Sequence, residues 1–327
     1  MPAALLRTAA RLVSSGVWTG VRHATLGSSR PGWSWLTETM LRFIRSTMDT
    51  APHNGLGLRR HVEQATVPCL VRHRVRHRDV TVAGLRGRWF EPRRGRHDGV
   101  LLYLHGGGYV FGSLRSHEDI ITRLALASGA RTLAVEYRLA PEHPYPAALN
   151  DCVAAYRWLL GEGVDPRRLA VAGESAGGAL TLGTLMTARD AGAPLPAAGV
   201  GISPWADLTM GCQSLATNEP YDFADRAFAA RCAAAYLAGA DPRSPLASPL
   251  FGDLRGLPPL LLQVGTAELL LDEVTLLAQR AEAAGVDVTL EAWDDMFHIW
   301  HFAALVLRQG AAAIEHVGRY VRHHTSA

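Results

Sequence analysis

The chain has 327 residues, of which 48% are hydrophobic and 19% charged, so it can bury a large core and is too apolar to be disordered. The net charge is only +3, all 33 basic residues are arginine, and the densest basic stretch, VRHRVRHRDV, alternates as a strand with one solvated face does. We therefore expect no nucleic-acid partner. The four cysteines show no CxxC spacing, which argues against zinc and is typical of a reduced, cytoplasmic protein.

The first residues, MPAALLRTAARLVSSGVW, are apolar, but Arg7 and Arg11 interrupt the run and no small-residue cleavage site follows. We therefore do not expect a signal peptide or stable membrane insertion. The apolar side chains recur at helical spacing and predict one stripe, made of Leu5, Leu6, Ala9, Leu12, Val13 and Val17. We expect the stripe to pack on the protein itself; a helix lying on a membrane surface is the alternative, which leaves peripheral association open.

From about Arg74 onward, strand and helix patterns alternate. The expected strands are a hairpin at 80–92, then 99–104, 131–137, 167–173, 195–204, 258–265 and 286–293. The expected helices are 116–129, 146–161, 175–192, 272–285 and 301–322. This alternation predicts an α/β fold with a mostly parallel sheet and helices on both faces.

Two segments stand outside the alternation. Residues 1–73 contain the helical WLTETMLRFIRSTMD, and residues 205–257 contain the helical RAFAARCAAAYLAGA. Both have the right size to cap the carboxyl ends of the strands. We therefore expect a catalytic domain at 74–327, with 205–257 as a cap insertion and 1–73 as N-terminal cap helices.

The stretch AVAGESAGGAL places Ser175 between Gly173 and Gly177, at a predicted strand-to-helix turn. Such a sharp turn exposes a serine hydroxyl, and the helix behind it offers unpaired N–H groups to a developing oxyanion. The motif alone is weak, because glycine is common in this chain. Its position at the turn makes Ser175 a candidate nucleophile.

A second motif, YLHGGGYVFGS, strengthens the first. Three glycines after a strand allow the N–H groups of Gly107 and Gly108 to converge on one point, with the N–H of Ala176 as a third donor. We expect His105 to orient this loop and not to act as the base.

At this point the chain resembles a known family. HGGG, EYRLAPEHPYPAA and GESAGG, in that order, are similar to the hormone-sensitive-lipase-like carboxylesterases of the α/β-hydrolases, from about Gly99 to the C-terminus. The resemblance implies an eight-stranded sheet, a serine–acid–histidine triad and short- to medium-chain acyl esters as substrates. It implies no metal and no organic cofactor. Glu174 stands where the family usually has Asp, and GTAELLLDE replaces the usual D-P-L-x-D-E.

The candidate base lies late, in EAWDDMFHIWHF. A serine needs a neighbouring base, histidine has a suitable pKa, and the chain order serine, acid, histidine is that of α/β-hydrolases. His298 follows the last predicted strand and matches the histidine of the family. We expect His301 to be a packing or capping residue, and Asp294 and Asp295 to face water or a neighbouring strand.

For the acid, Glu268 lies four residues past the end of a buried apolar run and at the first Asp position of the family pattern. There its side chain can turn back toward His298. Asp272 is the alternative acid; one helical turn further on, it is better placed to cap the next helix. A glutamate can replace aspartate, because the role is to hold and stabilise the imidazole.

The sequence therefore predicts a serine carboxylesterase acting on small-molecule esters. Two alternatives remain: a non-catalytic ligand receptor on the same fold, against which His298 argues, and a long-chain lipase at a membrane surface. For the lipase, Trp18, Trp33, Trp35 and Phe43 are candidates for an apolar rim. A homo-oligomer is also left open.

Overall fold

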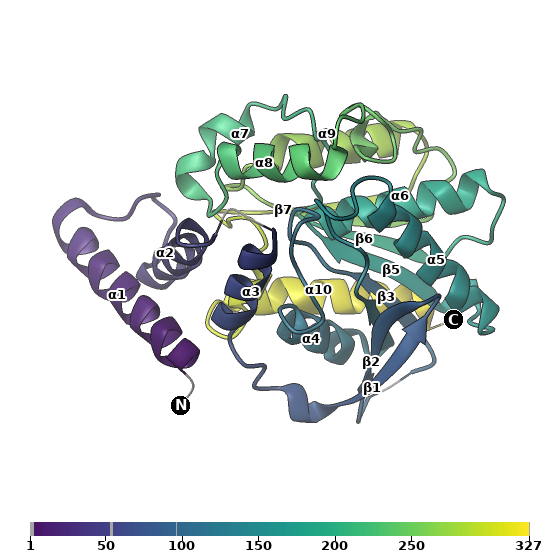
Figure 1. The fold of residues 1–327 in the computed structure, drawn as a ribbon, viewed down its shortest axis with the longest axis horizontal. Helices are drawn as coiled ribbons and strands as arrows, with labels where there is room; N and C mark the ends of the chain where they lie inside the picture. Colours follow the sequence, from purple (N-terminus) through teal and green to yellow (C-terminus); the bar gives the residue numbers. More distant parts are fainter. Residues whose placement is uncertain (1–2, 53–54, 96, 327) are drawn as a thin grey trace.

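The computed structural model describes residues 3–52, 55–95 and 97–326, and an eight-stranded sheet forms the centre of this part of the chain (Figure 1). The spatial order is β1-β2-β4-β3-β5-β6-β7-β8. The strands are Val75–Val82 (β1), Leu85–Pro92 (β2), Val100–Leu104 (β3), Arg131–Val135 (β4), Leu169–Glu174 (β5), Ala198–Ile202 (β6), Leu260–Gly265 (β7) and Val288–Trp293 (β8). Only the β1–β2 and β2–β4 pairs are antiparallel. The predicted α/β class and mostly parallel sheet are confirmed.

The burial of each strand explains its sequence. Every residue of β3, β5, β6 and β7 is buried, as expected for central parallel strands covered on both faces, and these are the continuous apolar runs. The edge strand β1 mixes exposed and buried positions, and the edge strand β8 has only half-buried and exposed ones.

Two helical layers cover the sheet. Helices α4 (Glu118–Ser128) and α10 (Arg308–Thr325) lie side by side on one face, with Leu101 and Tyr103 of β3 beneath them (Figure 1). Helices α5 (Ala147–Gly161), α6 (Ala176–Asp190) and α9 (Leu271–Ala283) cover the other face, where Leu102 and Leu104 point. The alternation of β3 side chains thus divides the core into two layers.

The last predicted helix differs from the observed one. Instead of one helix from His301, the structure has a short 3₁₀ turn, η5 (Trp300–Ala303), and α10 begins only at Arg308. Trp300 and His301 are fully buried in η5, so the chain must turn again before α10 can lie along the sheet.

The segments outside the alternation are helical. Residues 1–73 contain α1 (Ala3–Leu26), α2 (Trp35–Asp49) and α3 (Gly55–Ala65), and residues 205–257 contain α7 (Ser214–Thr217), η3 (Glu219–Tyr221), α8 (Arg226–Leu237) and η4 (Pro249–Phe251). Two further 3₁₀ turns are η1 (Arg72–Arg74) and η2 (Pro166–Arg168). The two segments meet where the Trp33 and Tyr221 rings pack edge to face, with centroids 6.0 Å apart.

The orientation predicted for the first helix is wrong. Leu12, Val13 and Val17 are 40%, 66% and 64% exposed, whereas the buried residues of α1 include Ser15 and Thr19. The side chains of Leu5 and Leu6 lie outside the described residues. The physical reason is the close α1–α2 contact: the Trp35 ring packs against Gly16 and its indole N–H donates to the Gly16 carbonyl (3.1 Å), so small residues must face inward.

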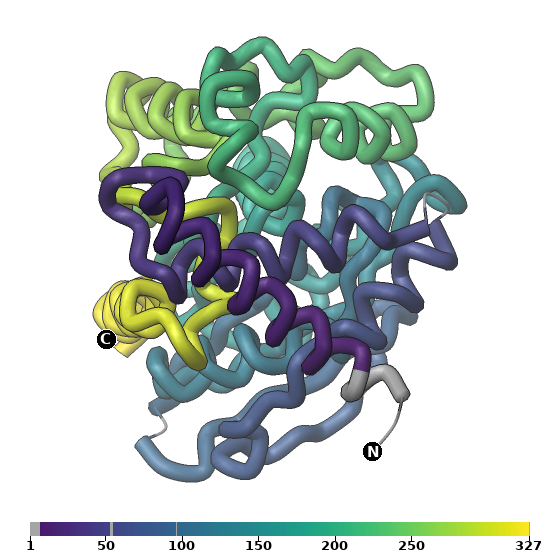
Figure 2. The backbone as a smooth tube through the Cα atoms, turned by 90° about the vertical axis from the view of Figure 1, so that its left-hand side faces the viewer, coloured from purple at the N-terminus to yellow at the C-terminus, as the bar shows by residue number. Residues whose placement is uncertain are grey.

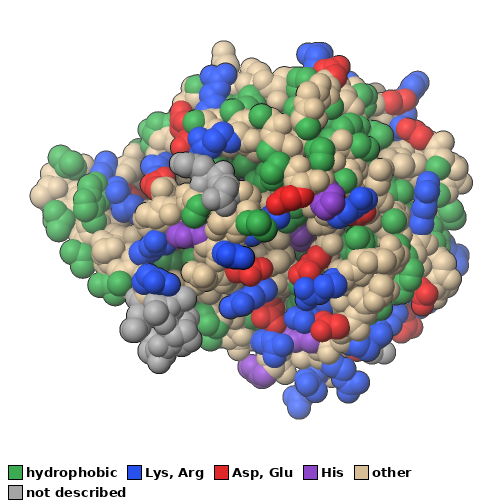
Figure 3. Space-filling view, viewed as in Figure 1, with side chains coloured by type: hydrophobic (Ala, Val, Ile, Leu, Met, Phe, Trp, Pro, Cys, Tyr) green, Lys and Arg blue, Asp and Glu red, His purple; other side chains and the backbone are tan. Residues whose placement is uncertain are grey.

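The apolar side of α1 therefore points outward. Figure 1 shows α1 as the outermost helix, Figure 2 shows it crossing the face turned to the viewer, and Figure 3 shows hydrophobic side chains gathered over it. Within the described ranges, no helix combines the length and hydropathy needed to cross a bilayer.

Candidate active site

Ser175 lies on a tight turn between β5 and α6, where its backbone has φ 54° and ψ −120°. The turn depends on close backbone contacts beside it. A Cβ on Gly177 would lie 2.0 Å from the Leu104 carbonyl oxygen, and one on Gly173 would lie 2.2 Å from the Gly177 carbonyl oxygen. Only glycine fits at these two positions, and the strained serine is lifted out of the sheet.

His298 lies in the loop after β8 and faces this serine. Its Nε2 atom is 3.0 Å from Ser175 Oγ, which is hydrogen-bonding distance. The side chain is almost fully buried, beside the ring of Phe223 (centroids 5.7 Å apart). The structure thus joins two residues that are 123 positions apart in the sequence.

Glu268 lies on the far side of the imidazole. One carboxylate oxygen, Oε2, accepts hydrogen bonds from Ser203 Oγ (2.8 Å) and the Gly265 N–H (3.1 Å). The other, Oε1, is 3.7 Å from His298 Nδ1, and neither of these two buried atoms has another partner among the described residues. The carboxylate is held by one oxygen and presents the other to the imidazole, across a gap that a small side-chain shift closes.

Charge around His298 favours its protonated form. Burial alone would lower the pKa of this imidazole, but the carboxylates of Glu268, Asp222 and Glu174 outweigh burial, and the pKa lies above its usual value. A base with a raised pKa accepts a proton readily, which suits the residue that must take one from the serine.

Asp272 does not have the role expected of it. Helix α9 begins at Leu271 and is preceded by Leu270, so Asp272 lies inside the first turn and does not cap it. Its carboxylate instead accepts from the Ser214 N–H (2.8 Å), and its own N–H donates to Ser214 Oγ (3.1 Å). The serine of α7 therefore takes the capping role, because α7 packs against this end of α9.

The glycine loop after β3 lies beside the serine turn. Gly107 and Gly108 both have positive φ (105° and 57°), and a Cβ on Gly107 would lie 2.3 Å from the Phe111 carbonyl oxygen. The Gly107 carbonyl accepts from the N–H groups of Val110 and Phe111, both at 3.0 Å. Within the described part of the chain, we find no hydrogen bond that occupies the N–H groups of Gly107, Gly108 or Ala176. These three donors are free to bind an anion next to Ser175.

Comparison with known proteins agrees with this geometry. A family model described as the alpha/beta hydrolase fold matches residues 101–302. An acetyl-hydrolase of Streptomyces hygroscopicus is 51% identical over 245 residues, covering 74% of this chain and 81% of that protein. An esterase of Acinetobacter venetianus is 33% identical over 226 residues, covering 68% and 74%. A crystal structure of an esterase from the bacterial hormone-sensitive lipase family aligns with TM-score 0.86 and 43% identity, over 90% of this chain and 99% of that one.

This chain belongs to the hormone-sensitive-lipase-like family of α/β-hydrolases. It is a carboxylesterase. The resemblance inferred from HGGG and GESAGG is therefore confirmed, and so is the ester-hydrolase class. The length of the acyl chain it prefers is a separate question.

In this carboxylesterase, Glu174 supports the glycine loop from below. It is fully buried, accepts from the Gly106 N–H and the Tyr103 hydroxyl, and pairs with His117 Nε2 at 2.8 Å. Burial alone would raise the pKa of Glu174, but His117 and the two hydrogen-bond donors outweigh it, so the pKa lies below its usual value. The residue before Ser175 thus connects the serine turn to the loop after β3.

Two buried histidines near the site make structural contacts. His105 stacks on Tyr137 (centroids 4.2 Å apart), and its Nδ1 lies 2.8 Å from the Gly106 carbonyl oxygen. His301 Nε2 lies 2.8 Å from Gln263 Oε1. Burial lowers the pKa of His105 to about 4 and that of His301 to about 3, so both stay neutral near pH 7. Asp295, on the same loop as His298, pairs with Arg30 at 2.6 Å.

Asp222 is a buried carboxylate at this site that the sequence did not reveal. It follows η3 in the helical segment 205–257, is fully buried, and accepts from the backbone N–H groups of Leu269 (3.0 Å) and His298 (3.3 Å). Burial, with the neighbouring Glu268, raises the pKa of Asp222 to about 7. No motif marks this residue; the only signal was its place in a helical insertion expected to lie over the strand ends.

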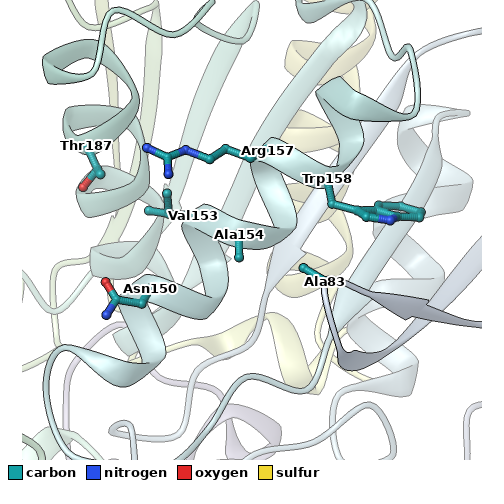
Figure 4. Close-up of a pocket in the computed structure, with 7 residues that line it drawn as sticks. All are labelled: Ala83, Asn150, Val153, Ala154, Arg157, Trp158 and Thr187. Atoms are coloured by element: carbon teal, nitrogen blue, oxygen red, sulfur yellow. The ribbon is translucent and has the colours of Figure 1, made fainter.

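Other surface features do not contribute to this site. A hollow of about 560 Å³ lies on the outer side of α5 and α6, lined by residues that include Asn150, Arg157, Trp158 and Thr187 (Figure 4). None of the candidate catalytic residues lines it. Among the residues that the structure describes, no three His, Cys, Asp or Glu side chains are grouped as a metal ion would require.

Proposed function

We propose that this carboxylesterase hydrolyses small esters with short- to medium-length acyl chains in the cytoplasm, through a covalent acyl-enzyme on Ser175. The observation that carries the proposal is the 3.0 Å contact between Ser175 Oγ and His298 Nε2 at a strained turn, next to three N–H donors for which the described residues supply no acceptor. Nucleophile, base and oxyanion donors then surround one point, where an ester carbonyl fits.

In the first half-reaction, His298 Nε2 takes the hydroxyl proton while Ser175 Oγ attacks the ester carbonyl carbon. The carbonyl oxygen becomes an oxyanion, which the N–H groups of Gly107, Gly108 and Ala176 stabilise. The tetrahedral intermediate collapses, the bond to the alcohol oxygen breaks, and His298 returns its proton to the leaving alkoxide. Glu268 holds the imidazole in the required tautomer and stabilises its positive charge.

In the second half-reaction, water replaces the alcohol. His298 takes a proton from the water as it attacks the acyl carbon, and the same three donors hold the second oxyanion. When this intermediate collapses, the bond to Ser175 Oγ breaks and His298 reprotonates the serine. The products are the free acid, the alcohol and the unchanged enzyme.

Residues 1–73 and 205–257 are proposed to cap this site and to set the acyl-length preference. Turnover on p-nitrophenyl esters from acetate to palmitate tests the proposal. We expect the highest kcat/KM at short to medium chains and a steep fall for the long ones. A maximum at the longest chains would contradict it, and no hydrolysis of any ester would favour the ligand-receptor alternative.

A second candidate function is ester hydrolysis at a membrane surface. The feature that favours it is helix α1. Its exposed side is apolar, with Val13, Val17 and Val21 all more than 60% exposed. Helix α1 also carries three arginines and no acidic residue, and Arg42 of α2 stacks 3.6 Å from the exposed Trp18 ring. A basic amphipathic helix with an interfacial tryptophan suits an anionic lipid surface.

Co-sedimentation with phosphatidylglycerol vesicles tests this candidate. The native chain should bind, and the V13E/V17E variant should not, because two glutamates oppose both the apolar and the electrostatic attraction. Leu276→Glu on α9, at a leucine that is 43% exposed and lies away from α1, is the control and should bind normally. If V13E/V17E instead converts a dimer to a monomer, the face binds a second copy of the chain and the membrane proposal is wrong.

A further inference from the structure

Asp222 belongs to the cap, yet its carboxylate contacts the turns that carry both the candidate acid and the candidate base. Oδ2 accepts from the N–H of Leu269, directly after Glu268. Oδ1 accepts from the N–H of Phe223 (2.7 Å) and from that of His298 itself (3.3 Å). One buried side chain therefore links the loop after β7 to the loop after β8.

A second residue of the cap, Asn218, binds the peptide group between Glu268 and Leu269 from the opposite side. The Asn218 amide donates to the carbonyl oxygens of Glu268 (2.9 Å) and Thr266 (3.3 Å). The Glu268 carbonyl and the Leu269 N–H belong to one peptide group, and they point in opposite directions because that bond is trans. Asn218 and Asp222 therefore bind both polar groups, the C=O and the N–H, of the peptide that follows Glu268. This restricts rotation of the turn that orients the Glu268 carboxylate.

The N-terminal helices contact the loop that carries Asn218 and Asp222 through Arg45 of α2. Its guanidinium donates to the carbonyl oxygens of Glu219 (3.1 Å), Pro220 (3.2 Å) and Asp222 (3.0 Å from Nε). A planar guanidinium with several donors can hold a short loop rigidly when each donor finds a carbonyl. Contacts therefore run without a break from α2 through Arg45 and Asp222 to Glu268 and His298.

We propose that Asp222 is a positioning residue of this esterase, which holds the backbones of Glu268 and His298 in register, and that Arg45 couples the N-terminal helices to it. The inference rests on the catalytic roles proposed above for Ser175, Glu268 and His298. Above its pKa of about 7, Asp222 also contributes negative charge near the imidazole. The charged or titratable groups that face His298 are Glu268, Asp222, Glu174 and the neutral His301.

The test compares Asp222→Asn with Asp207→Asn, measuring kcat and KM on p-nitrophenyl acetate, the pH profile of kcat/KM and the melting temperature. Asp207 is a matched control: it is buried in the same insertion and accepts from Thr209 N (2.8 Å) and Thr209 Oγ1 (2.6 Å), but it binds neither catalytic turn. Asp222→Asn places an amide donor against an N–H donor. We expect kcat to fall roughly 10- to 100-fold with KM nearly unchanged, because a small misplacement of catalytic groups has that effect.

The pH profile separates positioning from general destabilisation. Asp222→Asn removes the negative charge that Asp222 gains as it ionises near pH 7 and that stabilises the imidazolium, so the pKa of His298 falls and the acid limb of kcat/KM moves to lower pH. Asp207→Asn should leave both kcat and the acid limb in place. Normal kcat and an unmoved limb in folded Asp222→Asn would overturn the proposal, as would equal losses in the two variants.

A second pair tests the coupling and decides the matter if Asp222→Asn does not fold. Arg45→Met removes the donors to residues 219–222, whereas Arg42→Met, on the same helix, removes contacts to Glu38 and Trp18. We expect kcat to fall about 3- to 10-fold in Arg45→Met and to stay normal in Arg42→Met. Equal kcat in both would overturn the coupling. Failure of the native chain to hydrolyse esters would refute the proposed function itself, whereas an active native chain with a normal Asp222→Asn refutes only this inference.

Discussion

The two sides of the candidate active site are built differently. The serine side is a tight turn and a glycine loop packed against each other, where side chains larger than hydrogen would strike backbone oxygens 2.0 to 2.3 Å away. The acid–base side is assembled over long distances, since His298 meets Ser175 across 123 positions and Glu268 is held by Ser203, which is 65 positions away. Close backbone contacts admit only glycine and therefore leave a motif, whereas contacts between side chains can be made by many residues and leave none.

The largest effect is expected when the Ser175 hydroxyl is removed, which changes the chemistry of the serine side but not its shape. Ser175→Ala should keep the fold and lower kcat by on the order of 10⁴-fold or more, because no other group can form the acyl-enzyme. Turnover on p-nitrophenyl acetate and a thermal melt measure both quantities. As a control, a sulfonyl fluoride should label the native chain once, at Ser175. Labelling at another serine, or normal turnover in the variant, would contradict the mechanism.

The next largest effect is expected on the acid–base side, when Glu268 loses its charge. Glu268→Gln should keep the fold but lower kcat by on the order of a thousand-fold, because the imidazole loses the charge that orients and stabilises it. Asp272→Asn is the matched control; asparagine retains an oxygen for the Ser214 N–H, so kcat per folded molecule should be nearly normal. If Asp272→Asn were the inactive variant and Glu268→Gln the active one, the assignment of the acid would be reversed.

A third prediction concerns the backbone conformation of the glycine loop, on which the N–H donors of the serine side depend. Gly107→Ala places a methyl group 2.3 Å from the Phe111 carbonyl oxygen at a φ of 105°, so the loop must move and displace its N–H donors. We expect kcat to fall on the order of 100-fold, the usual effect of losing one oxyanion donor. Gly161→Ala, at the open end of α5, is the control and should be neutral in kcat. A normal kcat in Gly107→Ala would remove this loop from the mechanism.

The smallest effect is expected at Glu174, which connects the serine turn to the glycine loop. Glu174→Gln should lower kcat about 10-fold and lower the melting temperature at pH 7, because the bonds to His117 and the Gly106 N–H lose their charge. The folded-state pKa of Glu174 is depressed, so its ionisation stabilises the fold above its ordinary pKa, and that contribution is lost as pH falls through the folded value.

Melts of the native chain and Glu174→Gln between pH 7 and pH 3 measure this dependence. The difference in melting temperature should be largest near pH 7 and should shrink at the acid end. A difference that is constant with pH would mean that shape, and not charge, accounts for the effect of Glu174.

The sheet and its helices could be predicted because burial on both faces and helix-ending residues leave patterns in short stretches of the sequence. Mostly apolar runs such as Leu260–Gly265 are buried on both faces, and α4 is followed directly by Gly129, whose φ of 72° suits glycine. The serine turn and the glycine loop were predictable for the same reason. His298 and Glu268 were placed by chain order and by their distance from predicted strand ends, which parallel strands bring to one edge.

Tertiary structure alone decided the rest, because those features depend on which surfaces meet. Helix α1 shows an apolar stripe in sequence, yet its small residues face inward since the Trp35 ring packs against Gly16. Asp272 follows the pattern of a helix cap, yet packing of α7 brings Ser214 to that end of α9 and gives Asp272 another partner. Asp222 has no local signature at all: only the folding of residues 205–257 against the loops after β7 and β8 brings its carboxylate to the N–H groups of Leu269 and His298.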